Sequence, residues 1–335
     1  MSTQQFTVTA ETAGAVLGAL RKHVQNLPWS AARKHMEGRR ISVNGILCVD
    51  EGRRVVAGDV IELRHQPLPP PPRDDDVRIL HLDEHLVVVD KPAGMLSLRH
   101  PGDVKWRQER KDLQPSLEEC LHRLISRRRV AGSSNHSQEL LAVHRIDRET
   151  SGILVFARTE NAQQGLIAQF AAHTAMRKYL CVIPGKMSAQ TIVSYQIRDR
   201  GDGLRGSSDR PADGQKMVTH IRPLRQLGEY SELECRLETG RTNQIRIHLA
   251  EKSHPICGDV KYRGPFGQLP VVDLSNAPRL ALHATQLGFI HPVTQKSHDY
   301  QLPWPKDIQS WVRRLSSLGT EGTETSTGKN KKARS

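Results

Sequence analysis

A proline-rich segment constrains the fold of this chain more than any other feature. Residues 65–76 read HQPLPPPPRDDD, in which five prolines are followed by three aspartates. Proline fixes φ and lacks a backbone N–H, so such a run is incompatible with a helix or a central strand. We interpret it as a stiff, exposed linker between two folded parts, and a chain of 335 residues is long enough for two domains.

The part before this linker, residues 11–64, is predicted to be a small α+β domain. Apolar residues at helical spacing predict a helix over residues 15–25, and a second short helix is expected over 30–37 with Ser30 as its cap. Asn44-Gly45 between alternating apolar residues predicts a hairpin, because both turn positions need a positive φ. A last strand is expected over residues 60–63.

Basic side chains crowd these two helices and the turn after them. The order W-S-A-A-R-K-H-M-E-G-R-R-I-S-V-N-G, then V-A-G-D-V-I-E-L, resembles the small RNA-binding domain first named for ribosomal small-subunit protein four. The resemblance implies that the domain contacts RNA phosphates through a set of cations: Arg33, Lys34, Arg39 and Arg40. The alternative is a charged face that meets only water.

The part after the linker, residues 77–315, is predicted to be α+β with a mixed, largely antiparallel sheet. Strands are expected over residues 77–82, 85–90, 152–158, 178–184, 216–224, 230–238 and 279–290, and helices over 115–125, 161–175 and 243–251. The long basic stretch 102–138 is either an RNA-reading insertion or a loop. Residues 316–335 have almost no large apolar side chains and are predicted to be disordered.

Composition narrows the class of partner. The formal net charge is +13, which favours a polyanion such as nucleic acid. The five cysteines are scattered and form no C-x-x-C pair, so we expect neither a zinc site nor disulfides, and a reducing cytoplasm as the compartment. The sequence shows no metal or cofactor motif, no apolar run long enough to span a membrane and no secretory signal, and we expect none of these.

Two segments concentrate candidate chemistry. In H-R-I-D-R-E-T-S-G-I-L-V-F-A-R, Asp147 lies between Arg145 and Arg148 before a strand. Nearby cations keep a carboxylate ionised for attack, but they also suit a structural salt bridge, which local chemistry alone favours. In L-E-T-G-R-T-N-Q-I-R-I-H-L-A, Thr242 is the expected cap of a helix whose start favours anions. The alternative is a helix that is basic on its solvent face.

The first segment resembles the signature H-R-L-D-x-x-T-S-G-L-L-x-x-A-K of the large-subunit-rRNA type of pseudouridine synthases, the RluA family. Further segments resemble the same family in the same order: D-E-H-L-V-V-V-D-K-P-A-G-M, R-K-Y-L-C-V-I-P-G, G-R-T-N-Q-I-R-I-H-L-A, H-P-I-C-G-D-V-K-Y and R-L-A-L-H-A-T-Q-L-G-F-I-H-P. Together the matches span residues 83–292. The resemblance implies an enzyme without a cofactor that isomerises uridine to pseudouridine in structured RNA, and it favours the catalytic interpretation of Asp147.

The resemblance also implies roles for single residues. Asp147 matches the nucleophile, Tyr179 the active-site tyrosine and general base, and Arg241 the arginine that pairs with the aspartate. Arg145 matches the arginine that fills the gap left by the flipped nucleotide, and Ile245 an apolar residue against the tyrosine. His144 and Arg246 are counted among the RNA-contacting residues. Asn243 departs from the pattern, since the family most often has His there.

The partner implied is ribosomal RNA, with transfer RNA as the alternative, and we expect a monomer. Two other functions compete. A non-catalytic RNA-binding ribosome-assembly factor is disfavoured by the intact set Asp147, Tyr179 and Arg241. A metal-dependent nuclease using Asp147 and Asp259 would need several converging carboxylates, which these basic motifs do not supply.

Overall fold

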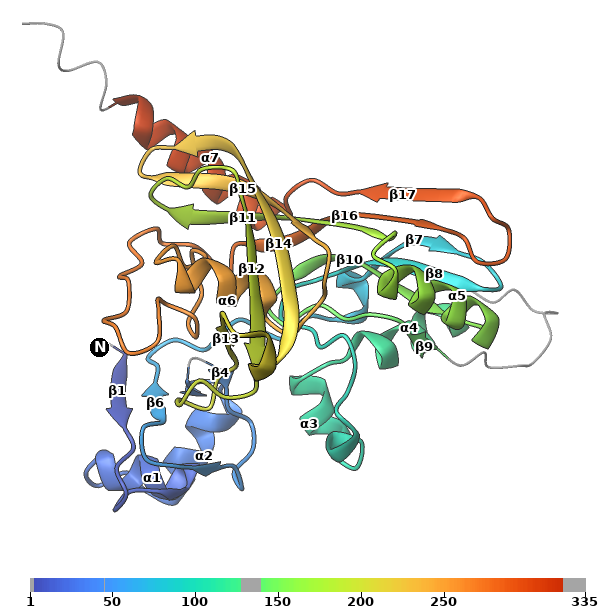
Figure 1. Ribbon diagram of the computed structural model, residues 1–335. Coiled ribbons are helices and arrows are strands. Elements are labelled where there is room, and N and C mark those ends of the chain that lie inside the picture. The colour runs from blue at the N-terminus through green and yellow to red at the C-terminus, as the bar shows by residue number, and fades with distance from the viewer. Residues whose placement is uncertain (1–2, 45, 128–139, 322–335) are drawn as a thin grey trace, which may run out of the picture. The chain divides into compact units, whose positions relative to one another are not determined.

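The computed structural model describes residues 3–44, 46–127 and 140–321. The chain divides into two compact units (Figure 1). The first comprises Met1–Arg73 and Arg99–Ser116, and the second Asp74–Leu98 and Leu117–Ser335. The first part of the basic stretch 102–138, up to Ser116, therefore groups with the N-terminal residues, and residues 128–139 lie outside the described part. The domain limits predicted from the sequence, 11–64 and 77–315, stay predictions.

The first unit contains the predicted helices and hairpin. Its helices are α1 (Val16–His23), α2 (Trp29–Glu37) and α3 (Gln108–Leu113), and its four-stranded sheet has the order β1 (Gln4–Thr7), β6 (Val60–Leu63), β3 (Ile41–Val43) and β4 (Ile46–Leu47). Two short strands, β2 (Gly14–Ala15) and β5 (Arg54–Val55), pair beside it. Val16, Leu20, Ile41 and Ile61 are fully buried in its core. Strand β1 was not expected from the sequence.

Two local predictions in this region are corrected. Helix α2 begins at Trp29 and its cap is Pro28, whose carbonyl accepts the Ala32 N–H, so Ser30 is not the cap. The three aspartates of the linker form a short 3-10 turn, η1 (Asp74–Asp76). Arg123 stabilises that turn by binding the Asp74 carboxylate at 2.6 Å. The hairpin prediction is confirmed at Asn44, which has a φ of 52°.

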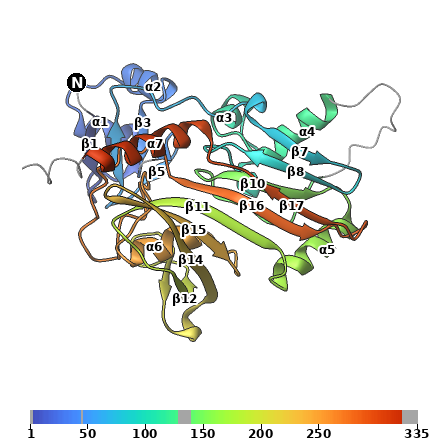
Figure 2. The same cartoon turned by 90° about the horizontal axis from the view of Figure 1, so that it is seen from above.

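The second unit is built on an eleven-stranded sheet within the described residues. Along the sheet the order is β13 (Gly206–Ser208), β12 (Gln190–Ile197), β14 (Gln215–Leu227), β15 (Tyr230–Leu237), β11 (Met176–Pro184), β16 (Leu282–Ile290), β10 (Ser151–Ala157), β8 (Leu86–Lys91) and β7 (Arg78–Leu82). Strand β17 (Ser297–Gln301) pairs with β16, and β9 (Leu141–Ala142) with β10. Only β10 and β16 run parallel among these pairs. The predicted mixed, largely antiparallel α+β fold is confirmed (Figure 2).

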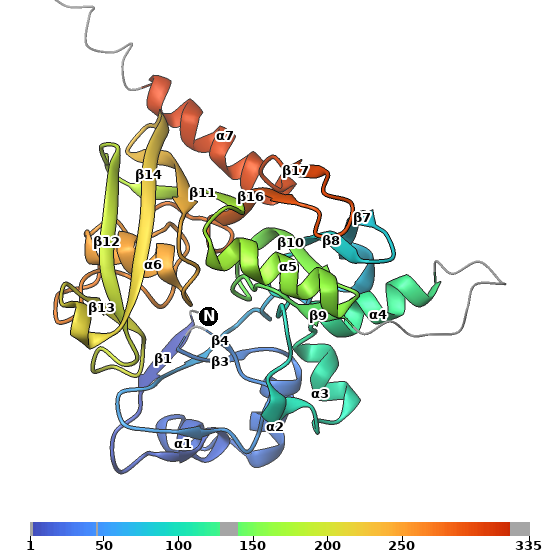
Figure 3. The same cartoon turned by 45° about the vertical axis from the view of Figure 1, so that its right-hand side comes forward.

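Alternating side chains give the strands two buried faces. On one face Val87, Val89, Leu154 and Phe156 share a core with α4 (Leu117–Arg127), α6 (Gln244–Glu251) and α7 (Lys306–Glu321). On the other face Val88 and its neighbours pack against α5 (Glu160–Ala171), which lies across β10 in Figure 3. Strands buried on both faces read as apolar runs, which explains L-V-V-V and I-L-V-F in the sequence.

The C-terminal prediction needs one correction. Helix α7 continues to Glu321, so residues 316–321, expected to be disordered, are helical. Its apolar face supplies Ile308, Trp311 and Leu315 to the core, and the last turns continue the helix that this packing establishes. Residues 322–335 lie outside the described part of the chain.

Candidate active site

Asp147 lies in the loop between β9 and β10, and the backbone on its N-terminal side is fixed by Ser97. The Ser97 hydroxyl donates to the Ile146 carbonyl at 2.7 Å, and the Ile146 N–H donates to the same hydroxyl oxygen at 3.2 Å. Ser97 is buried. One side chain thus satisfies both backbone groups of the residue before Asp147.

The backbone on the other side is fixed by the K-P-A-G turn. Fully buried Lys91 donates from Nζ to the carbonyls of Met95, Pro92 and Arg148 at 2.7, 3.0 and 3.2 Å, and the Gly94 N–H donates to the same Arg148 carbonyl at 2.7 Å. The Asp147 backbone is therefore held between two fixed neighbours. Such preorganisation is what a group that must meet a substrate at one geometry requires.

The glycine of the T-S-G turn has a steric reason. Gly152 has a φ of 118°, and a Cβ there would lie 2.2 Å from the Ala284 carbonyl oxygen of β16. Only glycine lets β10 approach its parallel neighbour this closely. The turn thereby sets where β10 starts and where the loop carrying Asp147 ends.

The second motif forms a turn and helix α6. The helix begins at Gln244, and its cap is Asn243 with a φ of 58°, so the prediction of Thr242 as the cap is wrong. The Thr242 carbonyl instead accepts a hydrogen bond from Gln196 at 2.7 Å. Residues 244–250 are all buried, as expected for a helix that packs on every side. The helix therefore carries Arg246 into the interior and does not have a basic solvent face.

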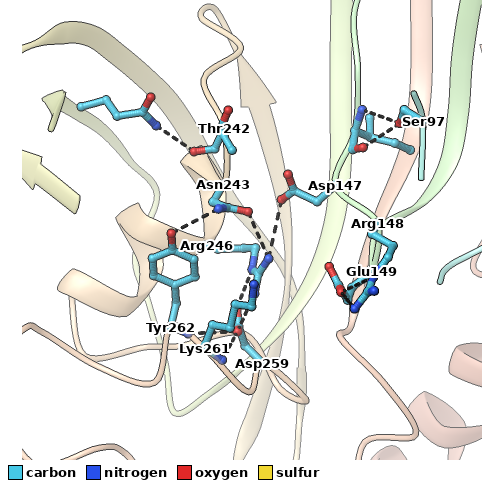
Figure 4. Close-up of polar contacts among 12 residues, drawn as sticks. Ser97, Asp147, Arg148, Glu149, Thr242, Asn243, Arg246, Asp259, Lys261 and Tyr262 are labelled. Atoms are coloured by element: carbon cyan, nitrogen blue, oxygen red, sulfur yellow. Dashed lines mark hydrogen bonds and ion pairs between the residues drawn. The ribbon is translucent and has the colours of Figure 1, made fainter. Parts of the chain in front are cut away.

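Arg246 is the arginine beside Asp147 (Figure 4). Its Nε and Nη2 donate to the two carboxylate oxygens of Asp259 at 2.7 and 2.8 Å, and Nη1 donates to Asn243 Oδ1 at 3.1 Å. Nη1 also lies 3.8 Å from Asp147 Oδ2. The fork of the guanidinium is thus fixed by Asp259 and Asn243, and its remaining charge faces the aspartate.

The expected pairing of Arg241 with Asp147 is wrong in this structure. Arg241 precedes the helix, is exposed, and its Nε donates to the Lys216 carbonyl at 3.4 Å. It still lines the pocket that contains Asp147. The physical reason for the different pairing is where α6 begins. Arg246 lies in the first turn of the helix and points inward, whereas Arg241 lies before the helix.

The carboxyl group of Asp147 is held in an unusual electrostatic state. Burial raises the pKa of Asp147, and the positive charge of Arg246 opposes this rise. About a fifth of the side chain, 19%, remains exposed, and no hydrogen bond within the described residues engages its carboxylate. A desolvated carboxylate beside a fixed cation, with its oxygens not engaged by hydrogen bonds, is suited to nucleophilic attack.

A cavity of about 510 Å³ joins these groups. Asp147 lines it together with Tyr179 of β11 and Ile245 of α6, and His144 and Arg145 lie on its wall beside them. The structure therefore brings together every second-unit residue that the sequence singled out as a site candidate: His144, Arg145, Asp147, Tyr179, Arg241, Ile245 and Arg246. The volume falls in the range of sites for small ligands.

Two of these residues have protonation states that limit their roles. Burial raises the pKa of Tyr179 to about 12, although Arg177 opposes the rise, so the phenol is neutral near pH 7. Burial, with Arg177, lowers the pKa of His144 to about 3. His144 is therefore neutral, and its Nε2 accepts the Val155 N–H at 3.2 Å. Its position in the pocket wall is fixed by the strand that follows Asp147.

Sequence reasoning missed three functional candidates. Asp259 was considered only as an acid of a nuclease, yet it holds Arg246 and its side chain is completely buried. Lys91 was part of a quoted motif without a role, and so was Arg177, which lines the pocket. A charged residue inside an otherwise apolar run was the available signal, as in V-V-V-D-K. The cations Arg33, Lys34, Arg39 and Arg40 belong to the first unit.

Within residues 3–44, 46–127 and 140–321, no three His, Cys, Asp or Glu side chains are arranged to hold a metal ion. All five cysteines are buried thiols that form no disulfide. No helix in the same part of the chain is long and apolar enough to cross a membrane.

The chain is similar to known proteins over most of its length. Residues 85–251 match the family model described as RNA pseudouridylate synthase. The chain is 34% identical to ribosomal large subunit pseudouridine synthase D of Zymomonas mobilis subsp. mobilis, over 94% of this chain and 98% of that protein. It is 36% identical to the protein of the same name from Xanthomonas campestris pv. campestris, over 76% and 73%. The solved structure of human RNA pseudouridylate synthase domain containing 4 shares the fold, with a TM-score of 0.52 and 23% identity over 71% of this chain and 92% of that one.

Proposed function

The chain belongs to the RNA pseudouridylate synthase family, and from this premise we propose that it isomerises uridines of large-subunit ribosomal RNA with Asp147 as the nucleophile. The observation that carries the assignment is the 3.8 Å ion pair between Asp147 and Arg246 in a pocket that also contains Tyr179. The two relatives described above are named for the large ribosomal subunit, which supports that RNA as the substrate.

The reaction rearranges one nucleotide and leaves the RNA chain intact. The bond between C1′ of the ribose and N1 of uracil breaks, the base turns, and C5 bonds to C1′. The Asp147 carboxylate assists bond breakage from its fixed loop, while Arg246 holds its charge and orientation. The C5 proton then leaves and N1 gains a proton, so that product and substrate are isomers.

Tyr179 is the proposed base for the C5 proton. Near pH 7 its phenol is protonated, because burial and the charge of Asp147 both raise its pKa. When the Asp147 carboxylate forms a bond to the substrate, it loses its negative charge and no longer raises the pKa of Tyr179. The positive charge of Arg177, which lowers that pKa, remains. Tyr179 therefore becomes more acidic, and its own proton passes to uracil N1, so that the phenolate oxygen can accept the C5 proton. In this proposal Ile245 packs the uracil of the substrate against the Tyr179 ring.

The target base must leave the RNA stack before it reaches this pocket. Flipping costs a few kcal/mol, and Arg145 is placed to occupy the space that the nucleotide leaves, since it is exposed at the pocket wall beside the nucleophile. Asn243, in place of the commoner histidine, fixes Arg246 and donates to the Tyr262 hydroxyl at 3.1 Å. Its role is to position the arginine.

The first unit is proposed to bind RNA without taking part in the chemistry. The V-N-G hairpin follows helix α2, in the order seen in the ribosomal-protein-four type of domain, and Arg33 and Lys34 are exposed. Such side chains add affinity through phosphates and release counterions. A monomer in a reducing cytoplasm stays our prediction for the state of the protein.

The test is to map pseudouridine in ribosomal and transfer RNA from cells that lack the native gene. The cells would carry wild-type protein, Asp147→Ala, or an empty vector. We expect sites in large-subunit ribosomal RNA that appear with the wild type and are absent with the other two. If the sites are found only in transfer RNA, transfer RNA replaces ribosomal RNA as the proposed substrate. If no site depends on the wild type, the catalytic proposal fails and a ribosome-assembly role takes its place.

A further inference from the structure

Arg177 is a buried cation in the pocket wall. It lies on β11 two residues before Tyr179, so the two side chains project from the same face of the strand. Both line the pocket that contains Asp147, and Arg177 is only 7% exposed. In the proposed reaction Arg177 acts only through its charge, which lowers the pKa of Tyr179.

The guanidinium is held in place by neutral partners. Its Nη2 donates to the Glu238 carbonyl at 2.5 Å, and its Cζ lies 5.2 Å from the centroid of the Phe170 ring. Gly240 packs against the other end: a Cβ at that residue would lie 2.4 Å from Nη1. The glycine of the G-R-T-N-Q motif is therefore required by the position of this guanidinium.

The guanidinium lacks an anionic partner in the described part of the chain. No carboxylate there forms an ion pair with it, and its Nε is buried without a hydrogen-bond partner. Burial of an unpaired charge is costly, and burial lowers the pKa of Arg177 accordingly. Arg246 in the same pocket shows the contrast, because Asp259 satisfies two of its nitrogens. A fixed, buried and uncompensated cation is suited to an anion that arrives with the substrate.

The anions of an RNA substrate are its phosphates, since uracil and ribose are neutral. A planar guanidinium recognises a phosphate through two parallel N–H donors. Two residues along a strand span about 7 Å, so a nucleotide whose base lies on Tyr179 can place its own phosphate at Arg177. Within the described residues the only hydrogen-bond acceptor of this guanidinium is the Glu238 carbonyl at Nη2, so Nη1 keeps its donors for a phosphate oxygen.

We propose that Arg177 is a binding residue for a backbone phosphate of the flipped nucleotide, held ready by Phe170, the Glu238 carbonyl and Gly240. The inference rests on the proposed function, because it takes RNA as the substrate. It extends that function to a phosphate subsite inside the catalytic pocket, separate from the exposed cations of the first unit.

The experiment measures conversion of an unmodified large-subunit ribosomal RNA transcript by full-length protein at several KCl concentrations. The variants are Arg177→Lys, Arg177→Gln and Gly240→Ala. In Gly240→Ala the new methyl group displaces the Arg177 guanidinium, which keeps its charge. Arg222→Gln is the matched control. This exposed arginine lies on β14 and pairs with Glu234 of β15 at 3.1 Å. Melting temperatures verify that each variant is folded.

We expect Arg177→Gln to raise KM about ten- to a hundredfold, the usual effect of a lost hydrogen bond to a charged group. The slope of log KM against log salt should also fall by about 0.7 to 0.9, the value for one phosphate contact. Gly240→Ala should resemble Arg177→Gln in KM, Arg177→Lys should recover part of the loss, and Arg222→Gln should match the wild type.

Two results would overturn the proposal. An unchanged KM and salt slope in both Arg177→Gln and Gly240→Ala would show that no phosphate binds there. A normal KM with a kcat whose pH profile is displaced would assign Arg177 to Tyr179 instead. Failure of the wild type to convert the transcript is a different result, because it would contradict the proposed function itself.

Discussion

The cations of the first unit and those of the pocket have opposite surroundings. Arg33 pairs with Glu51 at 3.1 Å, and about half of each side chain is exposed, 55% and 51%. The side chains of Arg246 and Asp259 are 4% and 0% exposed. Water screens the first pair, which is worth about 0 to 1 kcal/mol, whereas removal of one partner of a buried pair costs about 3 to 5 kcal/mol.

This difference separates two uses of positive charge in one chain. In our proposal the exposed cations of the first unit add to RNA affinity in small increments, and each can be replaced with little effect on the fold. Two buried cations of the pocket act against burial: Arg246 opposes the rise in the pKa of Asp147, and Arg177 opposes the rise in the pKa of Tyr179. Substitutions in the two regions should therefore differ in kind as well as in size.

The largest contrast is expected between Arg246 and Arg241. Arg246→Gln leaves the Asp259 carboxylate buried and unpaired, so we expect a loss of about 3 to 5 kcal/mol in the free energy of unfolding and loss of conversion. Arg241→Gln removes an exposed side chain and should cost less than about 1 kcal/mol. Urea unfolding and conversion assays on both variants measure this.

A double variant makes the comparison sharper. Arg246→Met with Asp259→Leu replaces the buried pair by apolar side chains, so stability should recover while conversion stays absent. Conversion by this double variant would show that Asp147 does not need the charge of Arg246.

The pH profile tests the electrostatics of the pocket. The proposed reaction needs the ionised Asp147 carboxylate, and burial raises the pKa of that group above the ordinary 3.8. Activity is therefore complete above this raised pKa and is lost as pH falls through it, at a higher pH than for an exposed aspartate. Arg145 lowers the same pKa, so Arg145→Gln should move the acid limb of kcat/KM further upward. A limb at the ordinary aspartate value would contradict the burial of the nucleophile.

A smaller effect on chemistry is expected from four cations of the first unit, of which Arg33 and Lys34 are exposed and Arg39 and Arg40 are half-buried. Replacement of Arg33, Lys34, Arg39 and Arg40 by Gln should raise KM and lower its salt slope by up to about 3, at about 0.7 for each phosphate contact. The kcat should change by no more than a few-fold. A kcat that falls with an unchanged KM would assign these residues to the reaction instead of to binding.

The smallest effect is expected at Asn243, which adopts a φ of 58°. Asn243→Gly keeps that backbone without strain, whereas Asn243→Ala should be about 1 to 2 kcal/mol less stable than the glycine variant. Both lose the hydrogen bond to Arg246, so kcat should fall equally in the two. Urea unfolding separates the backbone cost from the loss of the contact.

The sequence predicted most strands of the second unit but not the pairing of charges. A local motif singled out Asp147, whose role as nucleophile stays a proposal, and strands such as β8 follow from a local apolar run. The choice between Arg241 and Arg246 depends on where α6 begins and on Asp259, thirteen residues after Arg246. Contacts across the fold of this kind leave no local pattern. Strands β12 and β17 were missed for a related reason, since their positions alternate weakly between buried and exposed.

The most direct test of the account is the rate of pseudouridine formation by Asp147→Asn under single-turnover conditions on a large-subunit ribosomal RNA transcript. The amide keeps the shape of the side chain and removes its charge, so folding and RNA binding should persist. We predict a rate lower by about 10⁴-fold or more, the scale of loss for removal of a nucleophile. A rate within tenfold of the wild type, in protein with normal binding, would contradict a nucleophilic role for Asp147.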